Sequence, residues 1–277
     1  MSVIRVVHRT TFSYDQPVLA SYNEARMRPA ATAGQRVLDT ELHVPTATHL
    51  SAYTDYFGTT VDVVEVLAPH ETLTVRAECL VERDPAQRFE GASWEDVRRP
   101  EAVDALGEWL QPDPVTDPPE ELARFAADAA ARLDPQDAAI EICEHIGDRV
   151  EYRSGVTSVH GLAADAWRAG KGVCQDITHL ALGALRSVGI PARYVSGYIH
   201  PESAQVGEPV LGESHAWVEF SAGRWTQHDP TNRTDVGELH VRVAHGRSYA
   251  DVSPLRGVYS GGGTSRQTVE VRTTRES

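Results

Sequence analysis

One cysteine of the chain lies where a nucleophile could be activated. Cys174 follows a glycine-rich turn at residues 170–172 and begins a run whose apolar residues recur at helical spacing. Gly189 and Pro191 end this run, so the pattern predicts a helix that begins at Cys174. The first turn of a helix favours negative charge, because its backbone N–H groups are unpaired and the dipole is positive there. The thiolate is the reactive form of cysteine, so we predict that Cys174 is a nucleophile.

A nucleophilic thiol needs a base, and the base needs a group that orients it. The sequence predicts a hairpin of Ser214–Phe220 and Arg224–Asp229, joined by residues 221–223. With these residues as the loop, opposed positions have numbers that sum to 444, so His215 faces Asp229. Such a pair shares one face and lies about 5 Å apart. A loop of even length would put the two on opposite faces, so the hypothesis predicts an odd-length loop.

Three neighbouring groups compete with this assignment. In the same register, His228 points to the other face of the hairpin from His215. His179 lies more than one turn along the helix from Cys174 and is not expected to be the base. Asp176 lies in the first helical turn, where an acidic residue is stabilising without any chemical role. The predicted base and its orienting group therefore stay on the hairpin.

A zinc site built from Cys174, His179, His215 and His228 is the chemical alternative. It lacks a second cysteine nearby, and neither Cys-x-x-Cys nor His-Glu-x-x-His spacing occurs. The glycine run at residues 261–263 has no lysine and helix after it, so it is not a phosphate-binding loop. The acidic loop of a calcium site is also missing. We therefore predict no metal and no organic cofactor.

The composition is that of a globular protein with an acidic surface. The 277 residues are 41% hydrophobic and carry a formal net charge of −14, which disfavours nucleic acid and anionic membranes as partners. The 3 cysteines are too few for a disulfide framework, which indicates a reducing compartment. Cys79 and Cys143 have no glycine turn or helix start beside them and are predicted to be buried. The N-terminus lacks the apolar run of a signal peptide, so we expect a cytoplasmic protein.

The elements around these residues indicate an α+β protein in two parts. Residues 1–85 read as an N-terminal β domain of sandwich-like form, in which Ser21–Arg26 is expected to be a polar connector. Residues 86–118 are rich in proline and form a connector, and residues 119–277 form the core that carries the site. The expected strands of the first part are Val3–His8, Leu38–Val44, Thr48–Phe57, Thr60–Leu67 and Glu71–Val81.

The core is expected to combine helices with later strands. Before Cys174, helices are predicted at Glu120–Leu133 and Pro135–Val150, with a short one at Ala163–Trp167 and a turn-bearing stretch at Tyr152–Val159. Trp167 is as readily a core residue as a wall of the site. After the Cys174 helix, a strand is predicted at Ala192–His200 and a polar loop at residues 201–212.

Several stretches carry a resemblance to a known family. They are GKGVCQDITHLALGALRSVGIPARYVSGYIHP, SHAWVEF, the segment from Trp225 to Asn232, the approach YRSGVTSV and the tail GRSYADVSPLRGVYSGGG. The opening of the chain resembles the N-terminal β domain of the same family, through His8, Thr11, Tyr14, Pro17, Val18 and residues 21–28. Nearly the full chain thus resembles the bacterial transglutaminase-like family.

The resemblance implies a papain-like α+β core, with the nucleophile at a helix N-terminus packed on an antiparallel sheet. It also implies a Cys-His-Asp triad in that chain order, which falls on Cys174, His215 and Asp229. The expected reaction is acyl transfer through a thioester on an amide or peptide bond. Water as second nucleophile gives a protease or amidase, and an amine gives a transglutaminase. The expected partner is a protein, a peptide or a small amide, with no metal and no organic cofactor.

Two other classes of function stay open. A small-molecule acyltransferase of the arylamine N-acetyltransferase type also orders Cys, His and Asp, but it has its cysteine in the first third of the chain. Cys174 lies past the middle. A catalytically silent binding module of the same shape is the second alternative. It is disfavoured because Cys174, His215 and Asp229 are all present.

Overall fold

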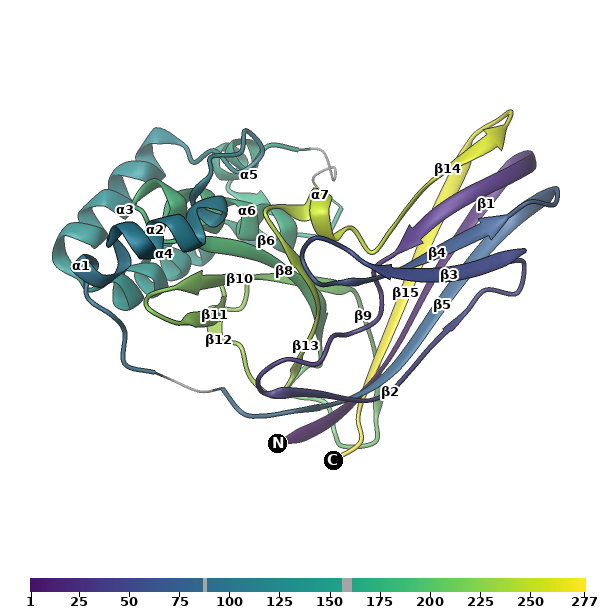
Figure 1. Cartoon of the computed structure of the whole chain (residues 1–277), viewed down its shortest axis with the longest axis horizontal. Coiled ribbons are helices and arrows are strands. Elements are labelled where there is room, and N and C mark those ends of the chain that lie inside the picture. Colours follow the sequence, from purple (N-terminus) through teal and green to yellow (C-terminus); the bar gives the residue numbers. More distant parts are fainter. Residues whose placement is uncertain (87–88, 156–160) are drawn as a thin grey trace.

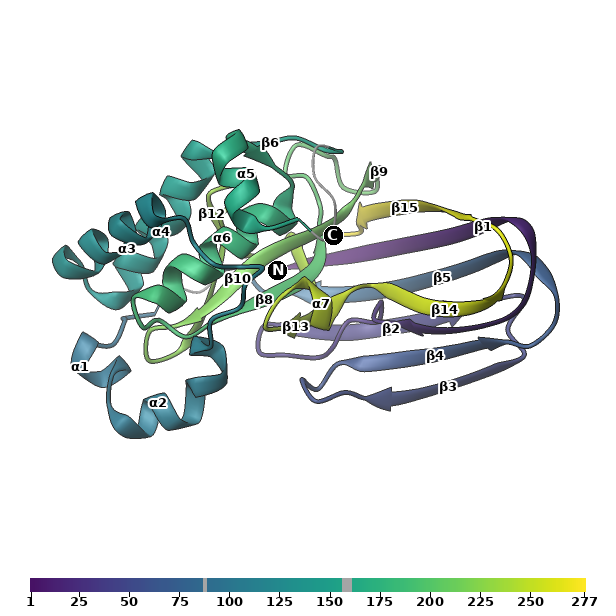
Figure 2. The same ribbon diagram turned by 90° about the horizontal axis from the view of Figure 1, so that it is seen from above.

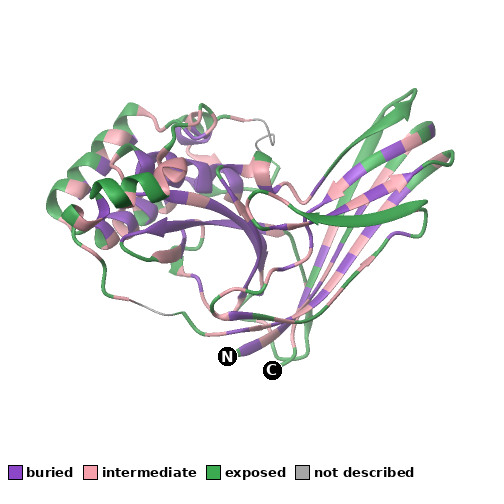
Figure 3. Ribbon diagram, in the orientation of Figure 1, coloured by how far each residue is buried: buried purple, intermediate pink, exposed green. Residues whose placement is uncertain are grey.

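Residues 2–83 form antiparallel strands, and buried residues alternate with more exposed ones along the two longest of them (Figure 3). The computed structural model describes residues 1–86, 89–155 and 161–277. The long strand β1 (Ser2–Ala25) organises this part, because its first half pairs with β5 (His70–Arg83) and its second half with β4 (Thr60–Val66). The strand β2 (Gln35–His43) pairs with β5, and the strand β3 (His49–Thr54) pairs with β4.

A core between the two halves of this sheet explains the alternation. Leu73 and Val75 of β5 and Val64 and Val66 of β4 are buried in one cluster with Met27. Burial of apolar side chains contributes about 25 cal/mol per Å² removed from water, so inward alternation fixes which face of each strand is inside. The expected sandwich-like β domain and α+β fold class are thus the observed ones.

The prediction that Ser21–Arg26 is a connector is wrong, because all of these residues except Arg26 belong to a strand. β1 continues through Ala25 and pairs there with β4 and β14 (Leu255–Gly261). Ser21 and Asn23 face inward and are buried, and the Asn23 amide donates to the Ser21 hydroxyl at 3.3 Å. Since the inward positions are polar or small, the apolar alternation that marks a strand is absent from the sequence.

The end of the chain returns to the first sheet. β15 (Ser265–Arg275) pairs with the first half of β1, and β14 pairs with its second half. Both lie inside residues 119–277, the range expected to form the core, so that expectation is wrong for them. Figure 1 shows them beside β1, with the short helix α7 (Tyr249–Val252) directly before β14. The short strand β9 (Pro209–Gly212), predicted as loop, joins the outer side of β15.

The second part is a five-stranded antiparallel sheet with helices on one face, among the described residues (Figure 2). Its central helix α6 (Cys174–Ser187) is buried from Gln175 to Arg186, because it lies between the sheet and the other helices. The strands, in order across the sheet, are β12 (Thr234–Asp235), β11 (Trp225–Asp229), β10 (Ser214–Ser221), β8 (Ala192–Ile199) and β13 (His240–Gly246). The covering helices are α3 (Glu120–Arg132), α4 (Pro135–Arg149) and α5 (Ala163–Ala169).

Shorter elements complete the structure. The connector packs on the core, since the Trp94 indole N–H donates to the Leu133 carbonyl at 2.8 Å. No helix among the described residues is long and apolar enough to cross a membrane. The predicted stretch Tyr152–Val159 falls partly outside the described residues. The short elements are α1 (Trp94–Val97), α2 (Pro100–Leu106), the 3-10 helix η1 (Gly107–Leu110), β6 (Glu151–Tyr152), β7 (Lys171–Gly172) and α7 (Tyr249–Val252).

Candidate active site

Cys174 is the first residue of α6, as the sequence predicts. Gly170 ends α5 with a left-handed φ of 65°, which turns the chain back into β7 and then α6. The Asp176 carboxylate accepts the Val173 N–H at 2.9 Å and so holds the start of the helix, which fits its expected structural role. The thiol of Cys174 is partly exposed, and its Sγ lies 4.0 Å from the Ser214 carbonyl oxygen. The nucleophile thus lies beside the beginning of β10.

The other two cysteines lie in the interior, as predicted. Burial raises the pKa of the Cys79 thiol to about 12 and also raises the pKa of Cys143. A thiol that stays protonated is a poor nucleophile. Cys174 is therefore the cysteine of this chain that is placed to react.

The hairpin of β10 and β11 has the predicted parity but a different register. Ser221 pairs with Trp225 and Val218 with His228, so paired numbers sum to 446. The loop is the three residues 222–224, one position later than expected, and its odd length confirms that prediction. By extension of this register, Asp229 opposes Trp217. His215 and Asp229 share a face but lie diagonally, because the sum differs from the predicted one by two.

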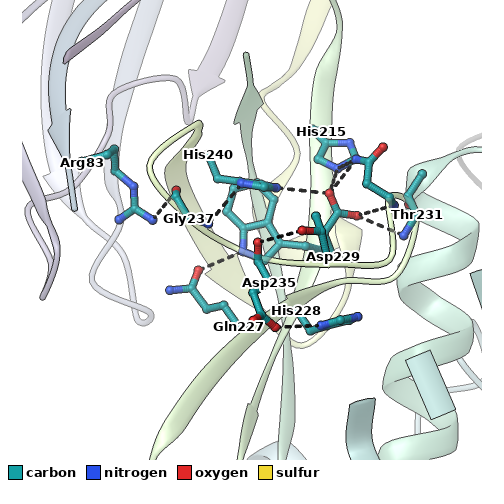
Figure 4. Close-up of polar contacts among 12 residues, drawn as sticks. Arg83, His215, Gln227, His228, Asp229, Thr231, Asp235, Gly237 and His240 are labelled. Carbon is teal, nitrogen blue, oxygen red and sulfur yellow. Dashed lines mark hydrogen bonds and ion pairs between the residues drawn. The ribbon is translucent and has the colours of Figure 1, made fainter. Parts of the chain in front are cut away.

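Asp229 is fully buried and accepts a set of hydrogen bonds (Figure 4). Its Oδ2 atom is 2.7 Å from Nε2 of His215 and accepts from the Asn232 amide at 2.7 Å. Its Oδ1 atom accepts the backbone N–H groups of Thr231 at 3.0 Å and of Asn232 at 3.1 Å. Such an arrangement fixes the plane of the carboxylate. His215, which is 8% exposed, is thereby held in one orientation.

The electrostatics favour a charged pair. Burial disfavours the anion of Asp229, but hydrogen bonds from His215 and His240 outweigh it and hold the pKa of the carboxyl well below its usual range. Burial likewise opposes protonation of His215, but hydrogen bonds to Asp229 and Cys174 raise the pKa of the imidazole above its usual value. Since Nε2 of His215 is bound to Asp229, Nδ1 is the nitrogen that remains for the thiol.

Two members of this cluster were missed in the sequence. Asn232 follows Asp229 by three residues. In turns, an Asp side chain typically accepts backbone N–H groups of the residues that follow it, so this spacing could have predicted that Asn232 lies beside Asp229. His240 is the first residue of β13, and its Nε2 lies 3.2 Å from Oδ2 of Asp229. Nothing in the sequence near His240 indicates this contact, because it depends on the order of strands in the sheet.

The competing residues have other partners. His179 accepts the Tyr249 N–H through Nε2 at 3.1 Å, and burial lowers its pKa to about 4. His228 is buried with Nδ1 3.6 Å from Asp235 and, by the register, faces away from His215. Trp167 is a core residue whose indole N–H donates to Glu121 at 3.1 Å.

One group among the described residues has ligand atoms close enough to share a metal ion, namely His215, Asp229 and His240, within 4.8 Å of one another. It is not the zinc set considered above. The Gly237 N–H donates to Nδ1 of His240 at 3.4 Å, so Nε2 of that ring carries its proton and donates to Asp229. The lone pair that a metal would need at Nε2 is therefore occupied. These atoms fit donors around a carboxylate better than ligands around a cation.

Comparison with known proteins gives the family. The sequence model of one protein family, the bacterial transglutaminase-like N-terminal region, matches residues 4–82. The family model of the transglutaminase-like superfamily matches residues 123–230. An uncharacterised protein of Mycobacterium leprae is 38% identical over 98% of each chain. The chain belongs to the transglutaminase-like superfamily.

Further relatives agree with this placement. An uncharacterised protein of Mycobacterium tuberculosis (strain H37Rv) is 31% identical over 92% of this chain and 86% of its own. The crystal structure of a candidate cysteine protease from Cytophaga hutchinsonii has a TM-score of 0.78 and 21% identity, over 99% of this chain and 91% of that one. This likeness shows the fold alone, a papain-like α+β core with antiparallel sheets.

Proposed function

We propose that this transglutaminase-like protein is a cysteine-dependent acyl-transfer enzyme that acts on amide or peptide bonds through a thioester. Cys174 is the nucleophile, His215 the acid and base, and Asp229 the residue that orients His215. The observation that carries the proposal is the 2.7 Å contact between His215 Nε2 and Asp229 Oδ2, with Cys174 on the same imidazole. A nucleophile, a base in contact with it and an orienting group are what this chemistry needs.

The proposed reaction begins when the Cys174 thiol gives its proton to His215 and the thiolate attacks the carbonyl carbon. The carbonyl electrons move to oxygen, where the Cys174 backbone N–H at the helix start is positioned to stabilise the charge. Collapse of this intermediate breaks the C–N bond, and His215 protonates the leaving amine. The acyl group is then a thioester on Sγ. Water or an amine, deprotonated by His215, attacks the thioester and releases the thiolate.

The second nucleophile decides the class of product. Water yields a carboxylic acid, so the enzyme acts as a protease or amidase. An amine yields a new amide, so it acts as a transglutaminase. The proposed substrate is a protein, a peptide or a small amide, and neither nucleic acid nor a membrane is proposed as a partner. We propose the cytoplasm as its location, which the free state of all three cysteines supports.

Trapping of the thioester tests the proposal without knowledge of the substrate. An activated ester such as p-nitrophenyl acetate is expected to give a rapid burst of nitrophenolate and an acetyl group on the peptide that contains Cys174, read by mass spectrometry. Cys174→Ala is expected to abolish the burst. Cys143→Ala is the matched control and is expected to retain it, because Cys143 is buried. No burst in the wild type, or acetylation at another residue, contradicts the proposal.

A further inference from the structure

A second histidine contacts the carboxylate that orients His215. His240 is 4% exposed, and its Nε2 lies 3.2 Å from Oδ2 of Asp229 (Figure 4). Its Nδ1 accepts the Gly237 N–H at 3.4 Å, which fixes the tautomer with the proton on Nε2. Burial lowers the pKa of His240. The ring is therefore a neutral donor toward Asp229 at neutral pH.

The ring of His240 is also held from its side. Trp217 meets it edge to face, with ring centroids 5.3 Å apart and planes at 77°. The Trp217 indole N–H donates to Gln227 at 2.9 Å, which fixes the indole in turn. The titratable and charged groups that act on His240 are Asp229, His215 and Arg83. The Asp229 carboxylate thus lies between the imidazoles of His240 and His215, and His215 is the one in contact with Cys174.

The segment that carries His240 is held by the N-terminal β domain. Arg83, at the end of β5, donates to the Gly237 carbonyl at 3.3 Å and to the Gly34 carbonyl at 3.0 Å. Gln35 of β2 makes two bonds to the backbone of Arg242, one from its amide to the carbonyl at 2.7 Å and one from the N–H to its Oε1 at 2.8 Å. A further ion pair joins the amino group of Met1 to Glu238.

These contacts form a continuous path between the two parts of the molecule. Figure 4 shows it running from Arg83 through Gly237 and His240 to Asp229. Arg83 is 4% exposed, and burial lowers the pKa of its guanidinium to about 10. Burying a charge is costly unless its donors are used. Two donors of Arg83 are used here, one on the Gly34 carbonyl of the N-terminal domain and one on the Gly237 carbonyl near His240, while its Nε has no partner among the described residues. The N-terminal domain therefore fixes the backbone on either side of His240.

We infer that His240 is a positioning residue of the reaction and that the N-terminal β domain, through Arg83 and Gln35, is part of the unit that aligns Asp229 with His215. The inference rests on the proposed function. It assigns the N-terminal domain a role in the chemistry, in addition to bracing the core. Without the donor from His240, Oδ2 of Asp229 loses one of its three N–H partners and the carboxylate is free to turn away from His215.

The test follows the rate at which iodoacetamide alkylates Cys174 in the full chain, from about pH 5 to about pH 9, with mass spectrometry to confirm the site. His240→Leu removes the donor and keeps the volume. It is expected to lower the rate at pH 6.5 about tenfold, since displacements of about 1 Å can cost up to about 100-fold. His240→Gln keeps an N–H near the position of Nε2 and is expected to restore most of the rate. Arg83→Met is expected to lower the rate in the same direction by a smaller factor.

His200→Leu is the matched control. His200 is 1% exposed and bonds Thr273 of β15 at 2.9 Å, so the variant loses a buried histidine at the same domain interface without touching Asp229. It is expected to keep the wild-type pH profile. If His240→Leu has the wild-type profile, or if His240→Gln and His200→Leu are impaired as much as His240→Leu, the inference is overturned. An ordinary thiol profile in the wild type overturns the proposed function itself and the inference with it.

Discussion

His215 and Asp229 meet diagonally across the β10–β11 hairpin, with Nε2 of the imidazole 2.7 Å from Oδ2 of the carboxylate. The contact is possible because the loop has an odd number of residues, which keeps both side chains on one face of the sheet. Asp229 ends β11, so the chain turns immediately after it and returns two backbone N–H groups to its Oδ1 atom. The turn thus holds the Asp229 carboxylate in place through Oδ1, and its Oδ2 atom points at the imidazole of His215.

Asp229→Asn tests this relationship. An amide at this position removes the charge and one acceptor oxygen, so it no longer stabilises the imidazolium or fixes its tautomer. We expect the alkylation rate of Cys174 at pH 6.5 to fall by about 100-fold or more. The thermal unfolding midpoint is expected to fall as well, because buried N–H groups that Asp229 accepts lose their acceptor. Rates within about twofold of the wild type would show that His215 needs no orienting carboxylate.

The sequence predicts the hairpin, its parity and the three residues of the site, but not their register. The loop lies at residues 222–224, where the Ala222 carbonyl accepts the Ala92 N–H at 2.9 Å and a side chain at Gly223 would meet Ala92 at 2.5 Å. This contact comes from the connector, over 100 residues earlier in the chain. Local turn propensity therefore could not distinguish a loop at 221–223 from one at 222–224.

Other features depend on long-range pairing in the same way. β12 and β13 lie at opposite edges of the sheet. The loop that connects them brings His240, at the start of β13, close to Asp229, at the end of β11. β14 and β15 join the N-terminal sheet by pairing with β1 across most of the chain. The periodicity of apolar residues indicates a strand but not the strand with which it pairs, so these placements could not be predicted from the sequence.

Gly197→Ala tests how tightly the sheet is packed behind His215. Gly197 pairs with His215 across β8 and β10, and a Cβ there would lie 2.1 Å from the Val241 carbonyl oxygen and 2.6 Å from the Trp217 ring. Since backbone must move to admit it, we expect the free energy of unfolding in urea to fall by about 1–3 kcal/mol. Gly212→Ala, where a Cβ meets nothing within 4 Å, is the control and should change it little. Equal effects of the two substitutions would refute the close packing.

His8→Gln tests the response of stability to acid. His8 is buried at the domain interface, where it bonds Tyr198 at 2.8 Å, and burial lowers its pKa to about 4. Below its ordinary pKa of about 6.5 the unfolded chain binds a proton that the folded chain does not, so stability falls as pH drops from about 6.5 toward 4. This one group accounts for about 2 kcal/mol by pH 5.

The measurement for His8 is urea unfolding at pH 7 and pH 5 in both proteins. The loss of stability between the two pH values is expected to be about 2 kcal/mol smaller in His8→Gln than in the wild type, because glutamine bonds without titrating. His70→Gln is the control, since His70 lies toward the surface. The same loss in His8→Gln as in the wild type would exclude His8 as a source of the acid sensitivity.

The central claim is that Cys174 and His215 form an activated pair, and the pH dependence of alkylation tests it most directly. The rate at which iodoacetamide modifies Cys174 should be measured against pH in the wild type and in His215→Ala. We predict a plateau that persists well below the ordinary thiol pKa of about 8.5 in the wild type and is lost in His215→Ala. Rates that rise only near pH 8.5 in both proteins would contradict the claim, because Cys174 would then be an ordinary thiol.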